Sequence, residues 1–222
     1  MRGPVIAIDG PAGAGKSTVA RLVADRLGLT VLDTGAMYRA LAVLAQQSGV
    51  STNDAPALAS LAQTADIRFD GENMRSVFIN GQEVSGEIRS LVIGQSASEI
   101  SVLPEVRHEL VRMQKSIIRD GRFVLEGRDT TTVVAPDADL KIFLTASIEE
   151  RARRRWLEAQ TDQAPSSLQD VVVDVVQRDH RDYSRADSPL CLGEDAVIIE
   201  TFGLNPPEVC NKIVRLLIGD DQ

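Results

Sequence analysis

A glycine-rich stretch near the N-terminus constrains this chain more than any other feature. Residues 10–17 read GPAGAGKS and match the phosphate-loop pattern GxxxxGK[ST]. The apolar run 5–8 precedes them, and apolar residues at helical spacing follow over 19–27. This strand–turn–helix context predicts a loop whose backbone N–H groups surround phosphate oxygens at the start of a helix. We therefore expect the chain to bind a nucleoside triphosphate.

The residues of this loop have distinct predicted roles. Lys16 is expected to reach the β- and γ-phosphates, and Ser17 to offer its hydroxyl to Mg²⁺. The alternative is a glycine-rich turn that binds no ligand, but a turn alone does not require a lysine followed by two hydroxyl residues. The predicted ATP-binding residues are Gly10, Pro11, Ala12, Gly13, Ala14, Gly15, Lys16, Ser17 and Thr18.

The size and charge of the chain limit the class of protein to which it can belong. Its 222 residues, 43% of them hydrophobic, suit one α/β domain with a sizeable core. The formal net charge of -8 repels the nucleic-acid backbone, so we expect no nucleic-acid partner. The apolar runs are too short to span a bilayer or to form a signal peptide. We expect a cytoplasmic monomer with no membrane partner.

Five short apolar runs recur at the spacing of alternating strands and helices. They cover residues 5–8, 30–32, 123–125, 140–144 and 197–199. Each is short and apolar enough to be a strand that is buried on both faces. With the helical segments between them they predict an α/β fold, a doubly wound, parallel five-stranded sheet with the nucleotide at the carboxyl ends of its strands.

Capping signals place the helices. We expect the helix after the phosphate loop to end at Gly28, and a second helix to cover residues 36–47. A capping box that starts at Ser147 predicts an arginine-rich helix. The last helix should open at Pro206 and close near Gly219.

Two segments need separate interpretation. Short alternating apolar runs flank the turn signal Asn80-Gly81, which predicts an antiparallel hairpin in an insertion of about residues 66–103. From Leu168 onward, valines recur at helical spacing although their β-branched side chains suit a strand. We expect periodicity to prevail there and the segment to be a helix.

Charged and polar side chains follow two of the predicted strands. Thr34 follows one strand, and the next helix should project Tyr38 and Arg39 above the sheet. Another strand leads into residues 126–129, with the sequence EGRD. Arg39 and Arg128 would then converge beside the phosphate loop, where a second phosphate-bearing ligand would fit. Taken singly, such residues are more often ordinary surface groups.

At these motifs the sequence resembles the bacterial-type cytidylate kinases, a family of nucleoside monophosphate kinases. The likeness runs nearly end to end and is more specific than the phosphate loop, which many unrelated ATPases share. It rests on residues 8–17 (IDGPAGAGKS), 32–39 (LDTGAMYR), 84–89 (VSGEIR), 127–129 (GRD), 132–134 (TVV), 136–138 (PDA), 141–144 (KIFL), 149–151 (EER) and 178–186 (RDHRDYSRA).

The resemblance implies a reaction and an organisation. The γ-phosphoryl group of ATP would be transferred in line to CMP or dCMP, with Mg²⁺ required. One P-loop kinase domain would cover residues 1–222, with an inserted monophosphate-binding subdomain at 66–103 and a lid region at 147–186.

The resemblance also implies roles for individual residues. Three arginines would hold the acceptor phosphate, namely Arg39, Arg128 and Arg185. Ser98, Arg107 and Asp129 match positions that read cytosine, and Arg178 and Asp182 match positions near the sugar. With Thr34 and Tyr38, these residues complete the predicted substrate-binding set.

The expected chemistry is charge neutralisation rather than proton transfer. Phosphoryl transfer is accelerated mostly by positioning and by cancelling charge, so we expect no general base. The arginine-rich segment, with Arg151, Arg154 and Arg155, resembles part of a lid over ATP. The predicted catalytic residues are Lys16, Arg128, Arg185 and Arg154. Ser17 would contact Mg²⁺, with Asp33 or Glu126 holding its waters.

Base selectivity has a simple expected cause. Cytosine presents an amino donor beside two acceptors, so a carboxylate such as Asp129 paired with a guanidinium such as Arg107 is complementary to it. Uracil presents the reverse pattern, and a misfitted buried polar group costs about 1–3 kcal/mol, or roughly ten- to a hundredfold in discrimination.

Two positions depart from the family pattern, and two other functions stay open. Thr131 stands where the family commonly has glycine, so a left-handed backbone there would be strained. Glu126 stands where aspartate is common. One alternative is another P-loop small-molecule kinase, acting on UMP, AMP or a non-nucleotide alcohol. The other is a nucleotide-driven switch, but Val214 occupies the aspartate position of the NKxD motif that Asn211-Lys212 would begin.

Overall fold

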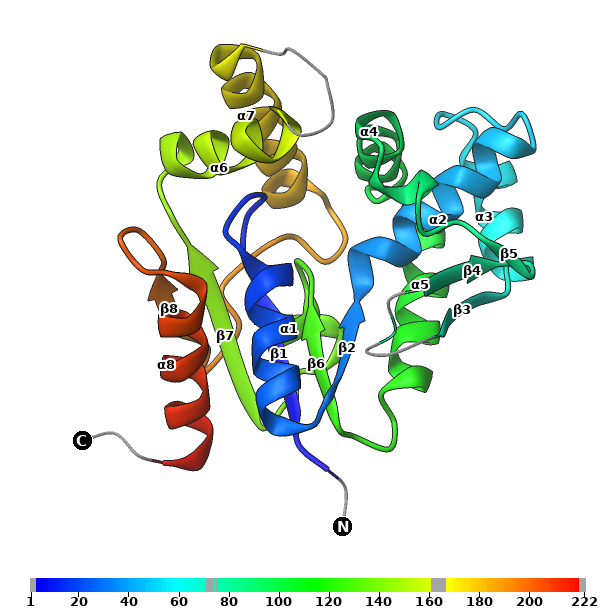
Figure 1. Ribbon diagram of the computed structural model, residues 1–222. Coiled ribbons are helices and arrows are strands. Elements are labelled where there is room, and N and C mark those ends of the chain that lie inside the picture. Colours follow the sequence, from blue (N-terminus) through cyan, green and yellow to red (C-terminus); the bar gives the residue numbers. More distant parts are fainter. Residues whose placement is uncertain (1–2, 71–73, 75, 161–166, 220–222) are drawn as a thin grey trace.

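Strands and helices alternate along most of the chain (Figure 1). The computed structural model describes residues 3–70, 74, 76–160 and 167–219. The strands are β1 (Val5–Asp9), β2 (Thr30–Asp33), β3 (Ile67–Asp70), β4 (Ser76–Ile79), β5 (Gln82–Glu83), β6 (Phe123–Glu126), β7 (Leu140–Thr145) and β8 (Val197–Glu200). The helices are α1 (Lys16–Leu27), α2 (Thr34–Gln47), α3 (Ala55–Thr64), α4 (Leu91–Ile100), α5 (Pro104–Ile117), α6 (Ile148–Gln160), α7 (Leu168–Ser184) and α8 (Pro206–Ile218), with short turns η2 (Glu87–Arg89) and η3 (Thr130–Val134).

A parallel five-stranded sheet forms the centre of the fold, as the sequence predicts. Its strand order is β2-β6-β1-β7-β8, so β1 lies in the middle and carries the phosphate loop at its carboxyl end. Each strand runs one residue beyond the predicted apolar run, because backbone pairing continues through the first polar residue. These added residues are Asp9, Asp33, Glu126, Thr145 and Glu200, and they form a polar rim at one edge of the sheet.

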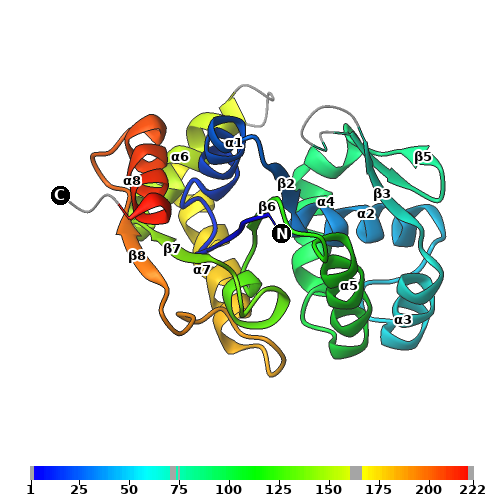
Figure 2. The same cartoon turned by 90° about the horizontal axis from the view of Figure 1, so that it is seen from below.

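The side chains of a central strand alternate between two apolar cores, one on each face of the sheet. In β1, Val5 packs into one cluster while Ile6 and Ile8 pack into the other, as the pleat of a strand requires. Residues of α1 and α8 complete the cluster around Ile6. Residues of α2, α5 and the insertion complete the cluster around Val5. Figure 2 shows the two groups of helices on opposite sides of the sheet.

The segment predicted to be an insertion contains its own small sheet and also packs into the main core. Strands β3, β4 and β5 pair antiparallel, and the turn between β4 and β5 has the positive φ angles that its sequence predicts, 51° at Asn80 and 82° at Gly81. Helix α3, for which no element was predicted from the sequence, packs against α5. Apolar residues of β4 and α4 lie in the same cluster as Val5, so the segment predicted to be an insertion shares one core with the parallel sheet.

Helices α6 and α7 lie beyond the carboxyl ends of the strands (Figure 1). The segment from Leu168 is a helix, which confirms the prediction made from the helical spacing of its valines against their β-propensity. Its buried valines, Val171 and Val175, pack against Ala152 of α6, so tertiary packing decides the conformation. Ser167 caps the helix with Asp170 in a reciprocal capping box. Residues 161–166 of the predicted lid lie outside the described residues.

A buried carboxylate joins the central strand to the turn η3. Asp9 is fully buried and accepts four hydrogen bonds, from the backbone N–H and the hydroxyl of both Thr130 and Thr131, at 2.7–2.9 Å. Thr131 is absent from the non-glycine residues with positive φ in the described chain, so the left-handed strain considered above does not arise. The threonine instead supplies two donors to Asp9.

We predict that Thr131→Val destabilises the fold while Thr132→Val does not. The valine keeps the shape of Thr131 but removes the hydroxyl that donates to Asp9 at 2.7 Å, so the free energy of unfolding should fall by about 1–3 kcal/mol. The Thr132 hydroxyl has only a 3.5 Å contact with a carbonyl oxygen. Urea unfolding of both variants measures the difference. Equal stability of the two would contradict this role of Asp9.

Candidate active site

Two adjoining cavities open above the carboxyl ends of the parallel strands. The inner cavity, of about 450 Å³, is lined by the phosphate loop, the ends of β2 and β6, and α7. The outer cavity, of about 760 Å³, lies between the insertion and α7. Both volumes are in the range of small-molecule sites. The linings share seven residues, so the two form one continuous cleft: Ser17, Arg21, Asp33, Arg39, Ser98, Arg155 and Arg178.

The phosphate loop joins β1 to α1 as its sequence predicts. Gly15 precedes α1 with φ of 89°, a left-handed conformation that favours glycine. The N-terminus of α1 therefore opens toward the inner cavity, which Gly13, Lys16 and Ser17 also line. Unpaired backbone N–H groups at a helix start attract phosphate oxygens. The loop is thus placed to receive an anion.

Lys16 is buried at the base of this cavity. Its ammonium donates to the carbonyl oxygen of Pro11 at 2.9 Å, within the loop itself. Burial, with the nearby guanidinium of Arg128, lowers the pKa of Lys16 from 10.5 to about 7. Glu126 and Asp182 act in the opposite direction. A bound polyphosphate would place negatively charged oxygens beside this ammonium, whose present hydrogen-bond partner is a neutral carbonyl.

One hydroxyl and one carboxylate form a pair that suits a hard cation. Ser17 donates to Glu126 at 2.5 Å, and burial together with Asp33 raises the pKa of Glu126. Mg²⁺ takes oxygen ligands, keeps several waters and often binds through a carboxylate and substrate phosphates. Asp33 is already engaged, because it caps α2 and binds Arg39 at 2.6 Å. The geometry therefore favours Glu126 over Asp33 as the carboxylate that would hold Mg²⁺ together with Ser17.

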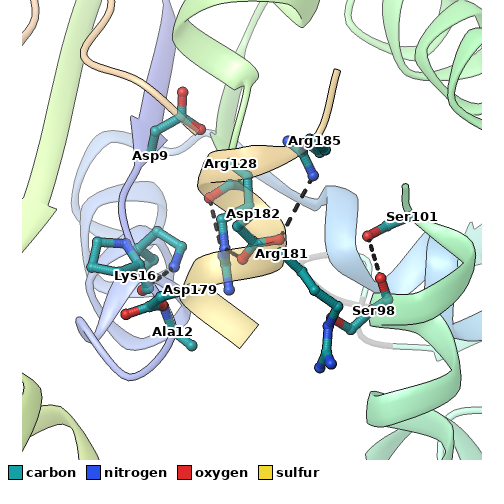
Figure 3. A network of polar contacts seen from close by, with 12 residues as sticks. Asp9, Ala12, Lys16, Ser98, Ser101, Arg128, Asp179, Arg181, Asp182 and Arg185 are labelled. Atoms are coloured by element: carbon teal, nitrogen blue, oxygen red, sulfur yellow. Dashed lines mark hydrogen bonds and ion pairs between the residues drawn. The ribbon is translucent and has the colours of Figure 1, made fainter. Parts of the chain in front are cut away.

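A single carboxylate holds two of the predicted phosphate-binding arginines. Asp182 of α7 accepts from Arg128 at 2.7 Å and lies 3.7 Å from Arg185 (Figure 3). Against the effect of burial, Arg128 and Arg178 hold the pKa of Asp182 below its usual value. Burial and Arg128 lower the pKa of Arg178 to about 9, which still leaves its guanidinium charged at neutral pH. Several cations thus surround one anion.

Four buried polar atoms of the site have no hydrogen-bond partner within the described part of the chain. Desolvated polar atoms without partners are costly and need an explanation. These four all belong to residues that line the inner cavity, where a ligand would provide partners. They are Tyr38 Oη, Arg107 Nε, Arg178 Nε and Arg185 Nη2.

The predicted base-reading residues meet at one end of the inner cavity. Arg107 is fully buried and forms a short ion pair with Asp129, while its Nη1 donates to the carbonyl of Ser101 at 3.0 Å. Its guanidinium carbon lies 5.6 Å from the ring centre of Tyr38. Burial raises the pKa of Asp129, and Arg107 opposes that shift. Ser98 lines the same cavity.

Most of the predicted site residues line the inner cavity. Three loop residues do not, namely Gly10, Pro11 and Ala14. Gly10 packs so tightly on β7 that a Cβ there would lie 2.0 Å from the carbonyl oxygen of Leu144. Arg154 lines the cavity, but its donors already bind Glu150 and Thr201.

Asp179 and Arg181 shape the site although no role was predicted for them there, and Arg151, which the resemblance places in the lid over ATP, also contributes. Asp179 and Arg151 contact the phosphate loop, and Arg181 donates to the hydroxyl of Ser98 at 3.0 Å across the cleft. The polar partners lie far apart in sequence, so spacing gave no signal for these contacts. The RDxRD run over 178–182 was the available clue, since a helix places these charges on neighbouring turns.

Comparison with known proteins decides the family. The pattern described as cytidylate kinase matches residues 6–218. The chain belongs to the cytidylate kinase family. A protein named cytidylate kinase from Desulfitobacterium hafniense is 47% identical over 211 residues, which cover 95% of this chain and 91% of that protein. One of the same name from Caldanaerobacter subterraneus is 45% identical over 212 residues, covering 96% and 93%.

Relatives also include longer proteins, and solved structures share the fold. A protein named bifunctional pantoate ligase/cytidylate kinase from Synechococcus sp. is 48% identical, and the match covers 97% of this chain but 41% of that protein. A shikimate kinase structure from Bacteroides thetaiotaomicron has a TM-score of 0.50 at 12% identity, covering 97% of this chain and 98% of that one. At this identity the likeness concerns the fold alone. Among the described helices, none is long and apolar enough to cross a membrane.

We predict that nucleotide binding takes up a proton at pH 8. The pKa of Lys16 is about 7 without ligand, and phosphates should raise it, so Lys16 binds a proton on complex formation between about pH 7 and the raised pKa. The affinity for Mg-ADP should therefore fall as the pH rises above about 7. Calorimetry at pH 8 in buffers of different ionisation enthalpy measures the uptake.

A matched variant isolates the contribution of this lysine. Lys16→Met lacks the titrating group, so any uptake that persists in it belongs to other residues. Absence of uptake by the unmodified protein at pH 8, with an affinity that does not change between pH 6 and pH 9, would contradict the lowered pKa of Lys16.

Proposed function

We propose that the protein is an ATP:(d)CMP phosphotransferase that transfers the γ-phosphoryl group to CMP or dCMP, giving CDP or dCDP and ADP. The observation that carries this proposal is the juxtaposition of a phosphate loop with a second cluster of cations in one cleft. The family of the chain supports the choice of acceptor. The expectations of a cytoplasmic location and of a monomer stay predictions.

Charge neutralisation is the proposed basis of the transfer. Two polyphosphate anions repel each other, so bringing them end to end requires cations on both sides. Lys16 and the loop amides would bind the donor, while Arg39, Arg128 and Arg185 would bind the acceptor phosphate. Arg128 and Arg39 are now paired with Asp182 and Asp33. These carboxylates orient the guanidinium groups before the phosphate arrives, which avoids reorganisation during the reaction.

The base would bind where Arg107 and Asp129 meet. A carboxylate accepts a hydrogen bond from the exocyclic amino group of cytosine, and a guanidinium donates to its ring acceptors. Uracil would place its O4 against the Asp129 carboxylate and leave both acceptors unsatisfied. The short Arg107–Asp129 pair and the Ser101 contact fix both groups beforehand.

The site also fits a bound magnesium ion. Ser17 and Glu126 would hold Mg²⁺ with phosphate oxygens and water, by the oxygen chemistry described above. When bound, the ion would supply positive charge to the donor phosphates.

We predict that CMP and dCMP are the best acceptors in a substrate panel. A coupled assay of ADP release with Mg-ATP should give kcat/KM values for CMP and dCMP at least about tenfold above those for UMP, AMP and GMP, because a mismatched buried polar group costs about 1–3 kcal/mol. Higher activity with UMP or AMP would assign another acceptor. Hydrolysis that needs no acceptor would favour a nucleotide-driven switch.

We predict that Arg128→Met impairs transfer but not donor binding. Removing one preorganised charge from the acceptor phosphate should lower kcat/KM for CMP about a hundredfold or more, while the Kd for Mg-ADP changes less than about twofold. Arg112→Met, which alters a solvent-exposed arginine of α5, is the matched control. Parallel loss of transfer and of ADP binding would contradict an acceptor role for Arg128.

A further inference from the structure

One ion pair joins both helices beyond the sheet to the phosphate loop. Arg151 of α6 and Asp179 of α7 are bound at 2.6 Å, and both are at least nine-tenths buried. Each also binds the backbone of Ala12, the third residue of the loop. Asp179 accepts from the Ala12 N–H at 3.2 Å, and Arg151 donates to the Ala12 carbonyl at 3.0 Å. Both polar groups of this one peptide residue are therefore held by the pair.

Packing around the pair leaves the loop little freedom. Gly13 lies against the first turn of α6, where a Cβ would be 2.8 Å from the carbonyl oxygen of Arg151. The Nε of Arg151 donates to the carbonyl of Ala146 at 2.9 Å, which fixes the guanidinium from its other side. Pro11 has no N–H, so the Ala12 N–H is the first backbone donor of the loop after Gly10. Because Asp179 engages this N–H and the Ala14 N–H donates to the Pro11 carbonyl at 3.4 Å, neither of these two amides is free to bind phosphate in this structure.

The position of Asp179 along α7 gives the contact a second consequence. Its neighbours Arg178 and Asp182 line the inner cavity on the acceptor side, and Asp182 holds Arg128. Figure 3 shows Asp179 beside Ala12 and Lys16, and Asp182 beside Arg128, on the same helix. Less than one turn of α7 thus separates the residue that holds the donor loop from the residues that face the acceptor.

We propose that Arg151 and Asp179 are positioning residues that set the phosphate loop relative to the acceptor-binding face of α7. Neither residue lines the inner or the outer cavity. The pair fixes Ala12, and through Ala12 the loop amides that bind the donor phosphates, at a defined distance from Arg178 and Asp182. Breaking the pair would release the loop from α7, weaken donor binding and misalign the two phosphates.

The proposal rests on the proposed function only in that the loop binds a nucleotide donor. Asp179→Ala and Arg151→Met should each raise the Kd for Mg-ADP about tenfold and lower kcat for CMP at saturating substrates about tenfold or more, since small misplacements of reacting groups are costly. The Kd for CMP, measured without donor, should change less than about twofold.

A double-mutant cycle separates positioning from general damage. Because the two residues act as one unit, Asp179→Ala together with Arg151→Met should lose about as much donor affinity as either variant alone. If the other variants do not fold, Asp179→Asn tests the pair instead, because it keeps an acceptor oxygen for the Ala12 N–H but removes the negative charge that binds Arg151. It should raise the Mg-ADP Kd by a smaller factor. Arg153→Met, on the exposed side of α6, is the matched control and should leave both constants unchanged.

Several results would overturn the proposal. These are unchanged donor affinity and kcat in Asp179→Asn and Asp179→Ala, additive losses in the double variant, or CMP affinity that falls in parallel with thermal stability. If the unmodified protein binds Mg-ADP but does not phosphorylate CMP, the proposed function fails. The Mg-ADP affinities of the variants then still decide the role of the pair.

Discussion

The carboxylate of Asp182 is the interaction on which the cleft depends. Without it, Arg128, Arg178 and Arg185 would face one another and Lys16 in a desolvated space, where like charges repel strongly. Burial, together with repulsion from Arg128, lowers the pKa values of Lys16 and Arg178. Asp182 contacts Arg128 and Arg185 directly and lies on the helix that also reaches the phosphate loop. The Asp182 carboxylate thus holds together the arginines of a cleft that is itself suited to bind phosphate.

The fold makes this arrangement possible by collecting polar residues at one edge of the sheet. Every strand of the parallel sheet ends on a polar residue, and three of these ends serve the site in different ways. Asp9 is fully satisfied by the threonines of η3 and is structural. Asp33 orients Arg39, and Glu126 accepts from Ser17. The same strand position therefore supplies stability, orientation and a candidate metal-binding group.

Local sequence signals were sufficient for the parallel sheet and for most of the other elements of the fold. The phosphate loop, the five apolar runs and the turn at Asn80 each specify their own conformation, and the spacing of valines in α7 predicts its helix despite their β-propensity. Helix α3 was missed because its sequence, rich in alanine with little polar contrast, gives a weak periodic signal. The positions of Arg39 and Arg128 after strand ends indicated a second phosphate site, and the likeness to a known family added Arg185, which no spacing rule connects to them.

Contacts between distant residues could not be predicted in this way. Asp9 and Thr131 are 122 positions apart, and Ala12 and Asp179 are 167 apart. Nothing local at either end indicates the partner. Thr131 shows the same limit, because its departure from glycine suggested strain, whereas its hydroxyl donates to the Asp9 carboxylate at the end of β1. Such pairings follow from the topology, which brings strand ends and α7 together.

The central claim is that two phosphates are brought end to end between the loop cations and the guanidinium groups that Asp182 and Asp33 orient. A crystal structure with CMP and a non-hydrolysable Mg-ATP analogue tests it most directly. The account predicts the CMP phosphate within hydrogen-bond distance of Arg39, Arg128 and Arg185, in line with the terminal phosphorus of the analogue. A CMP phosphate that contacts none of these arginines, or that lies out of line with that phosphorus, would contradict it.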